Sequence, residues 1–247
     1  MSLIAIFSDV HGNLPALKTV LKDIESKNAD QVYCLGDLVD FAPWTNEVID
    51  LIKSSRIPCL MGNHDERIAF DKPIIPLSKH SEEETIARKT AINYTKIMIS
   101  AANRAYLASL PRQLSLNYRF SNESVNILLV HASTRSNEEY IYENHDVTQV
   151  REMMNQYAAD ILVMGHTHES YIREVSFNTE EQKKLAVNCG SVGRSKEGYP
   201  HATYLLLAID DQNIKAELIK LAYPVHETIE GIRQSGIPDF YADFLIP

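Results

Sequence analysis

The chain has 247 residues, a length that can bury one large core without disulfides or a structural metal. Its net charge is −9, from 24 basic and 33 acidic residues, and this acidity disfavours binding along nucleic acid, which needs clustered Lys and Arg. The three cysteines show no Cys-x-x-Cys spacing, so we expect buried free thiols in a reducing compartment. The apolar N-terminal run ends at Ser8, too early for a signal peptide or a membrane span. We therefore expect a cytoplasmic protein without membrane contact.

The first part of the chain alternates between strand-like and helix-like segments. Apolar side chains recur at helical spacing from Leu14 to Ile24 and again over Glu47–Ile52. Around them lie short apolar runs typical of buried strands, at Leu3–Phe7, Gln31–Leu35, Pro58–Met61, Val125–Val130 and Ile161–Met164. The alternation of strand and helix predicts an α/β core built from βαβ units.

The chain after Met164 has a different pattern. Three strands are expected there without helices between them, at Leu185–Asn188, Ala202–Ile209 and Ile214–Leu221. The polar run Asp210–Asn213 predicts a hairpin between the last two. A parallel-rich first half and an antiparallel second half predict two packed sheets flanked by helices, in a single domain over residues 1–247.

Residues 66–122 form the longest stretch without a chemical motif. Ser81 and Glu84 have the spacing of a capping box, which predicts a helix that continues to Met98. A second helix is expected over Ala101–Leu110, where Pro111 ends it. These helices either form an insertion over the functional site that selects the substrate, or only cover a face of a sheet.

The C-terminal segment combines a helix with an aromatic tail. A short helix is expected over Val225–Gln234, ended by Gly236. The tail Pro238–Leu245 is too aromatic for a solvated terminus. We expect it to pack on the body of the protein or on a partner chain, and the second alternative would make the protein a homodimer.

Histidines and carboxylates gather in five clusters, each directly after a strand-like run. The clusters are Asp9-Val10-His11, Gly36-Asp37-Leu38-Val39-Asp40, Gly62-Asn63-His64-Asp65, His131 and Gly165-His166-Thr167-His168. Side chains at the ends of successive strands converge, so the clusters predict a site for two divalent metals. Imidazole nitrogen and carboxylate oxygen without thiolate suit manganese, iron, zinc or cobalt. Each cluster alone is a weak or moderate signal, whereas the full set in this order is a strong one.

This set of motifs, from residue 9 to residue 168, resembles the calcineurin-like metallophosphoesterase family. A weaker similarity to the small bacterial and archaeal phosphodiesterase-like branch continues through Asn188–Gly193. The resemblance implies a four-layer α/β/β/α sandwich, in which two mixed sheets are flanked by helices.

The chain departs from the family pattern at three places. Phe41-Ala42 follows the Gly-Asp motif where the protein phosphatases have Arg-Gly, and Asp65 stands where they carry Glu. Both differences argue against a phosphoprotein phosphatase. Arg194-Ser195-Lys196 replaces the more usual Gln-Pro-Arg, so the pattern itself does not support an anion contact by Arg194 or Lys196.

Carried over residue by residue, the resemblance implies two metal sites. One ion would be held by Asp9, His11 and His168, and the other by Asn63, His131 and His166. Asp37 would bridge the two ions with one oxygen on each. Such ions, with manganese favoured, could share a hydroxide that attacks the phosphorus in line with the leaving group.

The same resemblance leaves one histidine for chemistry. His64 would face the leaving group as general acid or steady the phosphoryl oxygens, and as an acid it needs an anionic neighbour to stay protonated. Asp40 is the candidate, although a hydrogen bond from the turn backbone to Asp40 is equally expected. Asn63, His64 and Arg194 are the residues expected to contact substrate. Asn13 is better explained as the N-cap of the following helix than as a phosphate contact.

These residues together predict a dinuclear metal-dependent phosphoesterase that hydrolyses a small phosphodiester or phosphomonoester. A nuclease of the same superfamily is the second hypothesis, opposed by the acidic charge and the lack of a basic groove interleaved with aromatic residues. A non-catalytic binding scaffold that keeps the fold is the third. Such scaffolds usually lose ligands, and this chain retains the full set.

Overall fold

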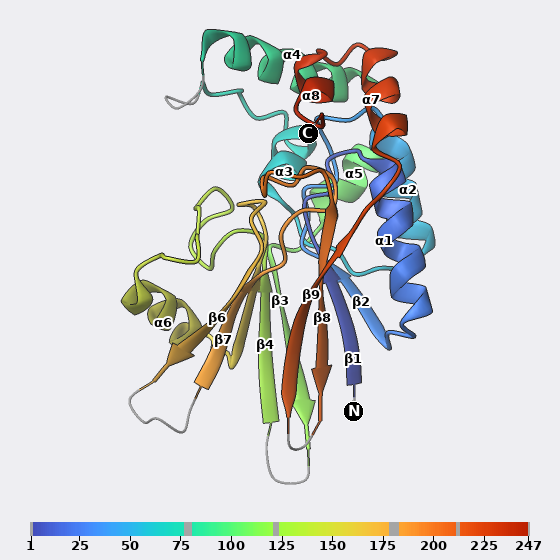
Figure 1. The fold of residues 1–247 in the computed structure, drawn as a ribbon. Helices are drawn as coiled ribbons and strands as arrows, with labels where there is room; N and C mark the ends of the chain where they lie inside the picture. The colour runs from blue at the N-terminus through green and yellow to red at the C-terminus, as the bar shows by residue number, and fades with distance from the viewer. Residues whose placement is uncertain (1, 77–80, 121–123, 178–182, 211–212, 247) are drawn as a thin grey trace.

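The computed structural model describes residues 2–76, 81–120, 124–177, 183–210 and 213–246, and it contains two mixed β-sheets (Figure 1). The first sheet has the order β2-β1-β8-β9, with bounds Ser2–Phe7 (β1), Gln31–Cys34 (β2), Ala202–Ile209 (β8) and Ile214–Leu221 (β9). The second has the order β3-β4-β5-β7-β6, with bounds Gln113–Arg119 (β3), Ser124–Val130 (β4), Ile161–Met164 (β5), Tyr171–Ser176 (β6) and Lys183–Asn188 (β7).

The two sheets pack face to face because each central strand has two apolar faces. Ile4 and Ile6 of β1 lie in the core between the sheets, against residues of β4 such as Ile127. The alternate residues, Ala5 and Phe7, face the opposite way and pack against the helix α1. This period of two puts one sheet face inside the sandwich and gives the other to the helices.

Helices complete the outer layers on both sides (Figure 1). The helices α1 (Leu14–Ser26) and α2 (Thr45–Ser54) cover the first sheet, and α6 (Val147–Gln156) covers the second through Met153 and Met154. The predicted α/β/β/α sandwich of two mixed sheets is confirmed. The remaining helices are α3 (Asn63–Ala69), α4 (Glu82–Met98), α5 (Ala101–Ser109), α7 (Val225–Arg233) and α8 (Phe240–Asp243).

Several expected elements differ from the structure. Pro58–Met61 is not a strand: only Cys59 forms a bridge, to Cys34, because β2 ends there and offers no further residues to pair with. The edge strands β3 and β6 and the helices α3 and α6 were not predicted. Parallel and antiparallel pairs also do not divide by chain half, because β8 from the second half pairs with β1.

The aromatic tail packs on the body of its own chain. Tyr241, Ala242 and Leu245 are buried in one cluster with Phe41 and with residues of α4 and α7. Of the two expected locations, the tail therefore occupies the body of its own chain. The homodimer stays a prediction. The three cysteines are buried and free, as expected. Among the described residues, no helix has both the length and the apolar character needed to cross a membrane.

Asn13 links the start of α1 to two distant segments. Its Oδ1 accepts hydrogen bonds from the backbone N–H of Ala16 (3.2 Å) and the hydroxyl of Thr228 (2.9 Å). Its Nδ2 donates to the carbonyl of Gly193 (3.0 Å) and the hydroxyl of Tyr223 (3.2 Å). The N-cap role expected for Asn13 is confirmed, and its side chain is fully committed to these four partners.

We predict that Asn13→Ala lowers the free energy of unfolding by about 2–3 kcal/mol, because it removes the cap and leaves buried polar partners unsatisfied. Urea denaturation measures the loss. Asn155→Ala, at an exposed position near the end of α6, is the matched control and should change the midpoint little. Equal midpoints for the two variants would contradict the role assigned to Asn13.

Candidate metal centre and active site

The predicted ligands lie at one edge of the sandwich, where the strands deliver them. Asp9 and His11 follow β1, Asp37 follows β2, and His131 directly follows β4. The Gly165–His168 turn follows β5 in the same way. All of these side chains are buried, and the structure brings every predicted ligand into one of two adjoining clusters.

The first cluster consists of Asp9, His11 and His168. The Nε2 atoms of the two imidazoles are 3.1 Å apart, and Asp9 Oδ1 is 3.1 Å from Nε2 of His168. The Nδ1 atoms of His11 and His168 lie 3.0 and 2.7 Å from the backbone carbonyls of Val39 and Arg194. A carbonyl only accepts, so both Nδ1 atoms carry the hydrogen and both Nε2 atoms present lone pairs.

That arrangement fits a divalent cation. Two nitrogen lone pairs and a carboxylate face one another in a buried space, and Asp9 Oδ1 has no hydrogen-bond partner among the described residues. Acceptors that face acceptors repel unless a positive charge lies between them. Nitrogen and oxygen donors without sulfur suit the borderline metals expected from the sequence.

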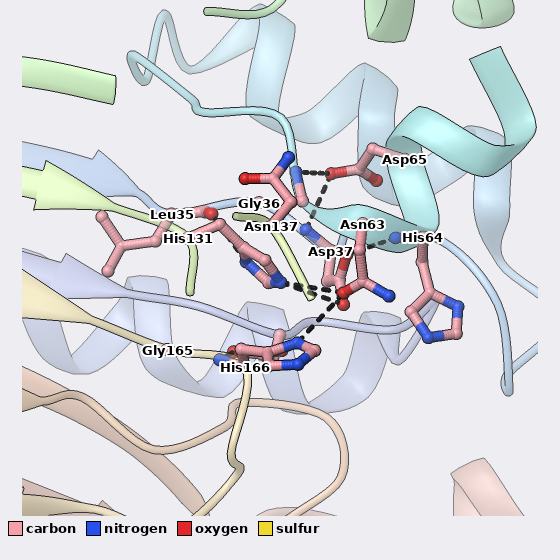
Figure 2. Close-up of polar contacts among 12 residues, drawn as sticks. Leu35, Gly36, Asp37, Asn63, His64, Asp65, His131, Asn137, Gly165 and His166 are labelled. Carbon is pink, nitrogen blue, oxygen red and sulfur yellow. Dashed lines mark hydrogen bonds and ion pairs between the residues drawn. The ribbon is translucent and has the colours of Figure 1, made fainter. Parts of the chain in front are cut away.

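The second cluster is built around Asn63 (Figure 2). Its Oδ1 lies 3.1 Å from Nε2 of His131 and 3.1 Å from Nδ1 of His166. Nδ1 of His131 lies 3.0 Å from the carbonyl of Leu35, which places a hydrogen on Nδ1 and aims Nε2 at Asn63. Together with Asp37, these side chains form the second donor set.

Asp37 lies between the clusters. Its Oδ2 is 3.4 Å from Nε2 of His131 in the second cluster and 3.8 Å from Nε2 of His11 in the first. Its Oδ1 accepts a hydrogen bond from the backbone N–H of His64 (2.8 Å). Oδ2 is thus the oxygen that lies near both clusters, and the role of Asp37 as a bridge between two ions stays a prediction.

The ligand loops are strained. Left-handed φ angles between 49° and 67° occur at Asp9, His11, Asp37, His166 and His168, a region that residues other than glycine rarely adopt. Glycines let these loops approach closely. A Cβ on Gly165 would lie 2.6 Å from Oδ2 of Asp9, and one on Gly62 would lie 2.1 Å from Oδ1 of Asp37.

Asp65 holds two of these loops together. Its carboxylate accepts backbone N–H bonds from Asp37 (2.7 Å), Leu38 (2.8 Å) and Gly62 (3.0 Å), as Figure 2 shows in part. In the sequence Asp65 was only a departure from the family pattern. Only its bond from the N–H of Gly62 has a local sequence signal, an acidic residue at the third position of a helix, and nothing local indicates the bonds from Asp37 and Leu38.

Burial and the neighbouring carboxylates control the histidine charges. Burial lowers the pKa of His166 and of His168 to about 3, which keeps both imidazoles neutral and able to bind a cation. Burial also lowers the pKa of His131, but the charge of Asp37 outweighs it and raises that pKa to about 9. Burial opposes ionisation of Asp9, yet its close contacts with His168 and His11 bring the pKa of Asp9 well below its usual range.

His64 and Asp40 form a pair beside the two clusters. Nδ1 of His64 lies 2.6 Å from Oδ2 of Asp40, and no hydrogen bond from the turn backbone reaches that carboxylate in the described part of the chain. Of the two contacts expected for Asp40, with His64 or with the turn backbone, the structure contains the contact with His64. Burial nevertheless lowers the pKa of His64 to about 4, more than the charges of Asp37 and Asp40 raise it, so the neighbouring carboxylates alone do not keep the imidazole protonated.

The clusters open into a pocket of about 810 Å³, a volume typical of sites for small molecules. Asp37, Asn63 and His64 line its floor, and Arg194 lies on its wall. The guanidinium of Arg194 is within 4.4–5.4 Å of the ring centres of Phe41, Tyr241 and Phe244. The backbone carbonyl of Arg194 also fixes His168, so this residue contacts both the pocket and a predicted ligand.

An α/β/β/α sandwich with two His and Asp clusters at its strand ends defines the class of metallophosphoesterases. The chain belongs to the calcineurin-like phosphoesterase superfamily, whose domain matches residues 2–212. Members of this superfamily are generally phosphoesterase hydrolases that use divalent metals.

Three proteins illustrate the relationship. A metallophosphoesterase from Sphaerobacter thermophilus has a TM-score of 0.74 and 25% sequence identity, with 99% of this chain and 98% of that chain covered. An uncharacterized protein of Methanocaldococcus jannaschii, MJ0912, is 28% identical over 255 residues, 99% of this chain and 97% of its own length. A symmetrical bis(5'-nucleosyl)-tetraphosphatase of Nitrosococcus oceani is 32% identical over 136 residues, 53% of this chain and 44% of its own length.

We predict that Asp65→Asn lowers the free energy of unfolding by about 2–3 kcal/mol and weakens Mn²⁺ binding, because an amide NH₂ would face buried backbone N–H groups. Thermal unfolding with and without Mn²⁺ reports both effects. Asp239→Asn, an exposed carboxylate at the start of α8, is the control. Unchanged stability and metal affinity in Asp65→Asn would show that Asp65 does not organise the ligand loops.

Proposed function

We propose that this protein is a dinuclear metal-dependent phosphoesterase that hydrolyses a small phosphodiester or phosphomonoester. The observation that carries the proposal is the pair of donor clusters, which share the carboxylate of Asp37 and open beside His64 into one pocket. In this proposal Asp9, His11 and His168 hold one divalent ion, and Asn63, His131 and His166 hold the other.

Two such ions would supply Lewis acidity, which activates water and stabilises the charge that develops on the phosphoryl oxygens. Asp37, which lies between the two clusters, would keep the two sites adjacent. The donor set of nitrogen and oxygen favours manganese, with iron, zinc and cobalt as alternatives. The carbonyls behind His11 and His131 orient their rings, so the geometry for the cations is present before binding.

Hydrolysis forms a bond from the oxygen of water to phosphorus, breaks the bond from phosphorus to the leaving oxygen, and moves a proton to that oxygen. His64 is the proposed proton donor, or it steadies the phosphoryl oxygens, and Asp40 fixes its ring through Nδ1. Because the substrate brings negative charge close to the imidazole, binding favours the protonated form of His64. Asn63 and Arg194 are the further side chains proposed to contact the substrate.

The alternatives have weaker support. A nuclease of the same superfamily is opposed by the net charge of −9, and the named activity of the Nitrosococcus relative concerns a small nucleotide. A non-catalytic scaffold is opposed by the complete donor set. The three buried free thiols support a reducing compartment such as the cytoplasm, and the homodimer is kept as a proposal without further support.

We predict that metal-depleted protein hydrolyses bis(p-nitrophenyl) phosphate only after a divalent ion is added, with Mn²⁺ among the effective ions. Release of p-nitrophenolate measures turnover. Asp37→Asn replaces the shared carboxylate by a neutral amide and should abolish turnover. Absence of stimulated turnover with Mn²⁺, Fe²⁺, Zn²⁺ and Co²⁺ on diesters and monoesters would contradict the proposed function. Stoichiometric metal without turnover would favour the scaffold, and degradation of DNA at low salt would favour the nuclease.

His64→Ala should reduce kcat by about 10²–10⁴-fold and leave both metals bound, because the side chain is proposed to act in proton transfer or charge stabilisation. Elemental analysis of the purified variant measures the metal content beside the kinetics. His226→Ala, at an exposed position in α7, is the matched control. Loss of one metal in His64→Ala would instead make His64 a ligand.

A further inference from the structure

The charge of the pocket is opposite to the charge of the chain. Of the described residues that line it, seven are Lys or Arg and four are Asp or Glu, whereas the whole chain has 24 basic and 33 acidic residues. One of the four acids, Asp37, belongs to the metal centre. Another, Glu66, is paired with Lys72 (2.7 Å) and with Arg112. The composition of the chain, which is acidic, therefore does not explain the excess of positive charge in the pocket.

Three of the basic side chains are placed unusually. Arg67 comes from α3, Arg88 from α4 and Arg194 from the loop after β7, so distant segments bring them to one pocket. Arg67 is only 6% exposed and Arg88 only 8%. Arginines are rarely buried to this degree unless they are paired.

Their pairing inside the protein is incomplete. Nη1 of Arg67 and Nε of Arg194 have no hydrogen-bond partner among the described residues. Nη2 of Arg67 lies 3.5 Å from Glu138, a side chain that is 72% exposed and therefore screened by water. Arg88 donates to the backbone carbonyl of Ile75 (2.9 Å), a neutral acceptor.

Arg67 and Arg88 lie close enough for the charge of one to affect the other, and Arg88 and Arg194 share Tyr241 as a neighbour. Burial lowers the pKa of the Arg88 guanidinium, and the charge of Arg67 lowers it further, while Tyr241 and Asp40 oppose the shift. Tyr241 lies near Arg194 as well, with the guanidinium 5.4 Å from its ring centre. Glu84 is an acid that faces Arg194 from α4 and offsets part of its charge.

Buried like charges with unsatisfied N–H groups are unfavourable until an anion joins them. The guanidinium fork matches phosphate geometry, and arginine is the side chain best suited to bind phosphoryl groups. The scissile phosphoryl group belongs at the metal clusters. The volume of about 810 Å³ leaves room in the same pocket for a second group beyond it.

We propose that Arg67, Arg88 and Arg194 form a binding site for a second phosphoryl group of the substrate. This assignment rests on the proposed phosphoesterase function and narrows its substrates to phosphoesters that carry at least two phosphoryl groups. The second group is attached either through an anhydride to the first or at a distance, as in a bisphosphate. Because Arg88 lies on α4, this helix takes part in substrate selection.

Calorimetry on the metal-depleted full chain tests the anion site without turnover. Inorganic pyrophosphate should bind, and Arg67→Gln and Arg88→Gln should each weaken it by about 10- to 100-fold, the loss expected for a charged hydrogen bond. Arg119→Gln, on the exposed end of β3 outside the pocket, is the matched control. Circular dichroism confirms folding of each variant. No pyrophosphate binding, or binding that neither pocket variant weakens, would overturn the proposal.

Kinetics with Mn²⁺ test selectivity. The ratio of kcat/KM for P1,P2-di(p-nitrophenyl) pyrophosphate to that for bis(p-nitrophenyl) phosphate should fall by about 10- to 100-fold in Arg88→Gln. An equal loss on both substrates would place the arginines on the scissile group and overturn the proposal. A sugar bisphosphate as competitive inhibitor distinguishes a distant second phosphate from an anhydride. If the wild-type protein turns over neither ester, the phosphoesterase function fails and calorimetry alone decides on the anion site.

Discussion

The first candidate metal cluster depends on one electrostatic constraint, which is that hydrogen-bond acceptors are held facing one another without hydrogens between them. The Nδ1–H groups of His11 and His168 donate to the carbonyls of Val39 and Arg194, so both Nε2 lone pairs face Asp9 Oδ1, at 3.7 and 3.1 Å respectively. A protein interior stabilises such an arrangement poorly on its own. The folding energy of the sandwich must hold it in place until a cation makes it favourable, and this requires rigid surrounding loops.

That rigidity has a structural cost. Five ligand residues adopt left-handed φ angles, each a local strain on the order of 1–3 kcal/mol, and the loops tolerate it because other contacts over-determine them. Asp65 fixes the loops of Asp37 and Gly62 through three backbone N–H bonds, and Asn188 fixes the turn of His166 through the carbonyl of Gly165 (2.6 Å). Residues that never touch a metal or a substrate thus determine where the ligands lie.

The sequence predicted features that depend on neighbouring residues, such as strands and motifs. It did not predict features that depend on contacts between distant segments. The strands β5, β8 and β9 have the predicted bounds because each is a continuous run with a clear ending, and the candidate ligands could be singled out because most of their motifs follow a strand. The charged residues Arg173-Glu174 hid the edge strand β6, and the apolar character of Pro58–Met61 predicted a strand where the chain forms only the single bridge from Cys59 to Cys34. Asp65 was recognised as a difference but not as a support, because its partners are backbone groups 27 and 28 residues away. Arg67 and Arg88 carried no motif at all, and only the folded chain places them in one pocket.

The pocket combines two kinds of charged groups, and this bears on specificity. Asp37 and the imidazoles of His166 and His168 are suited to attract cations, whereas Arg67, Arg88 and Arg194, which also line the pocket, attract anions. A cation at the floor would make the entire pocket positive within a chain of net charge −9. An acidic exterior repels extended polyanions such as nucleic acid, while a recessed positive site focuses the field on small anions that can enter. The same separation of charge therefore disfavours a nuclease and favours a compact, multiply phosphorylated substrate.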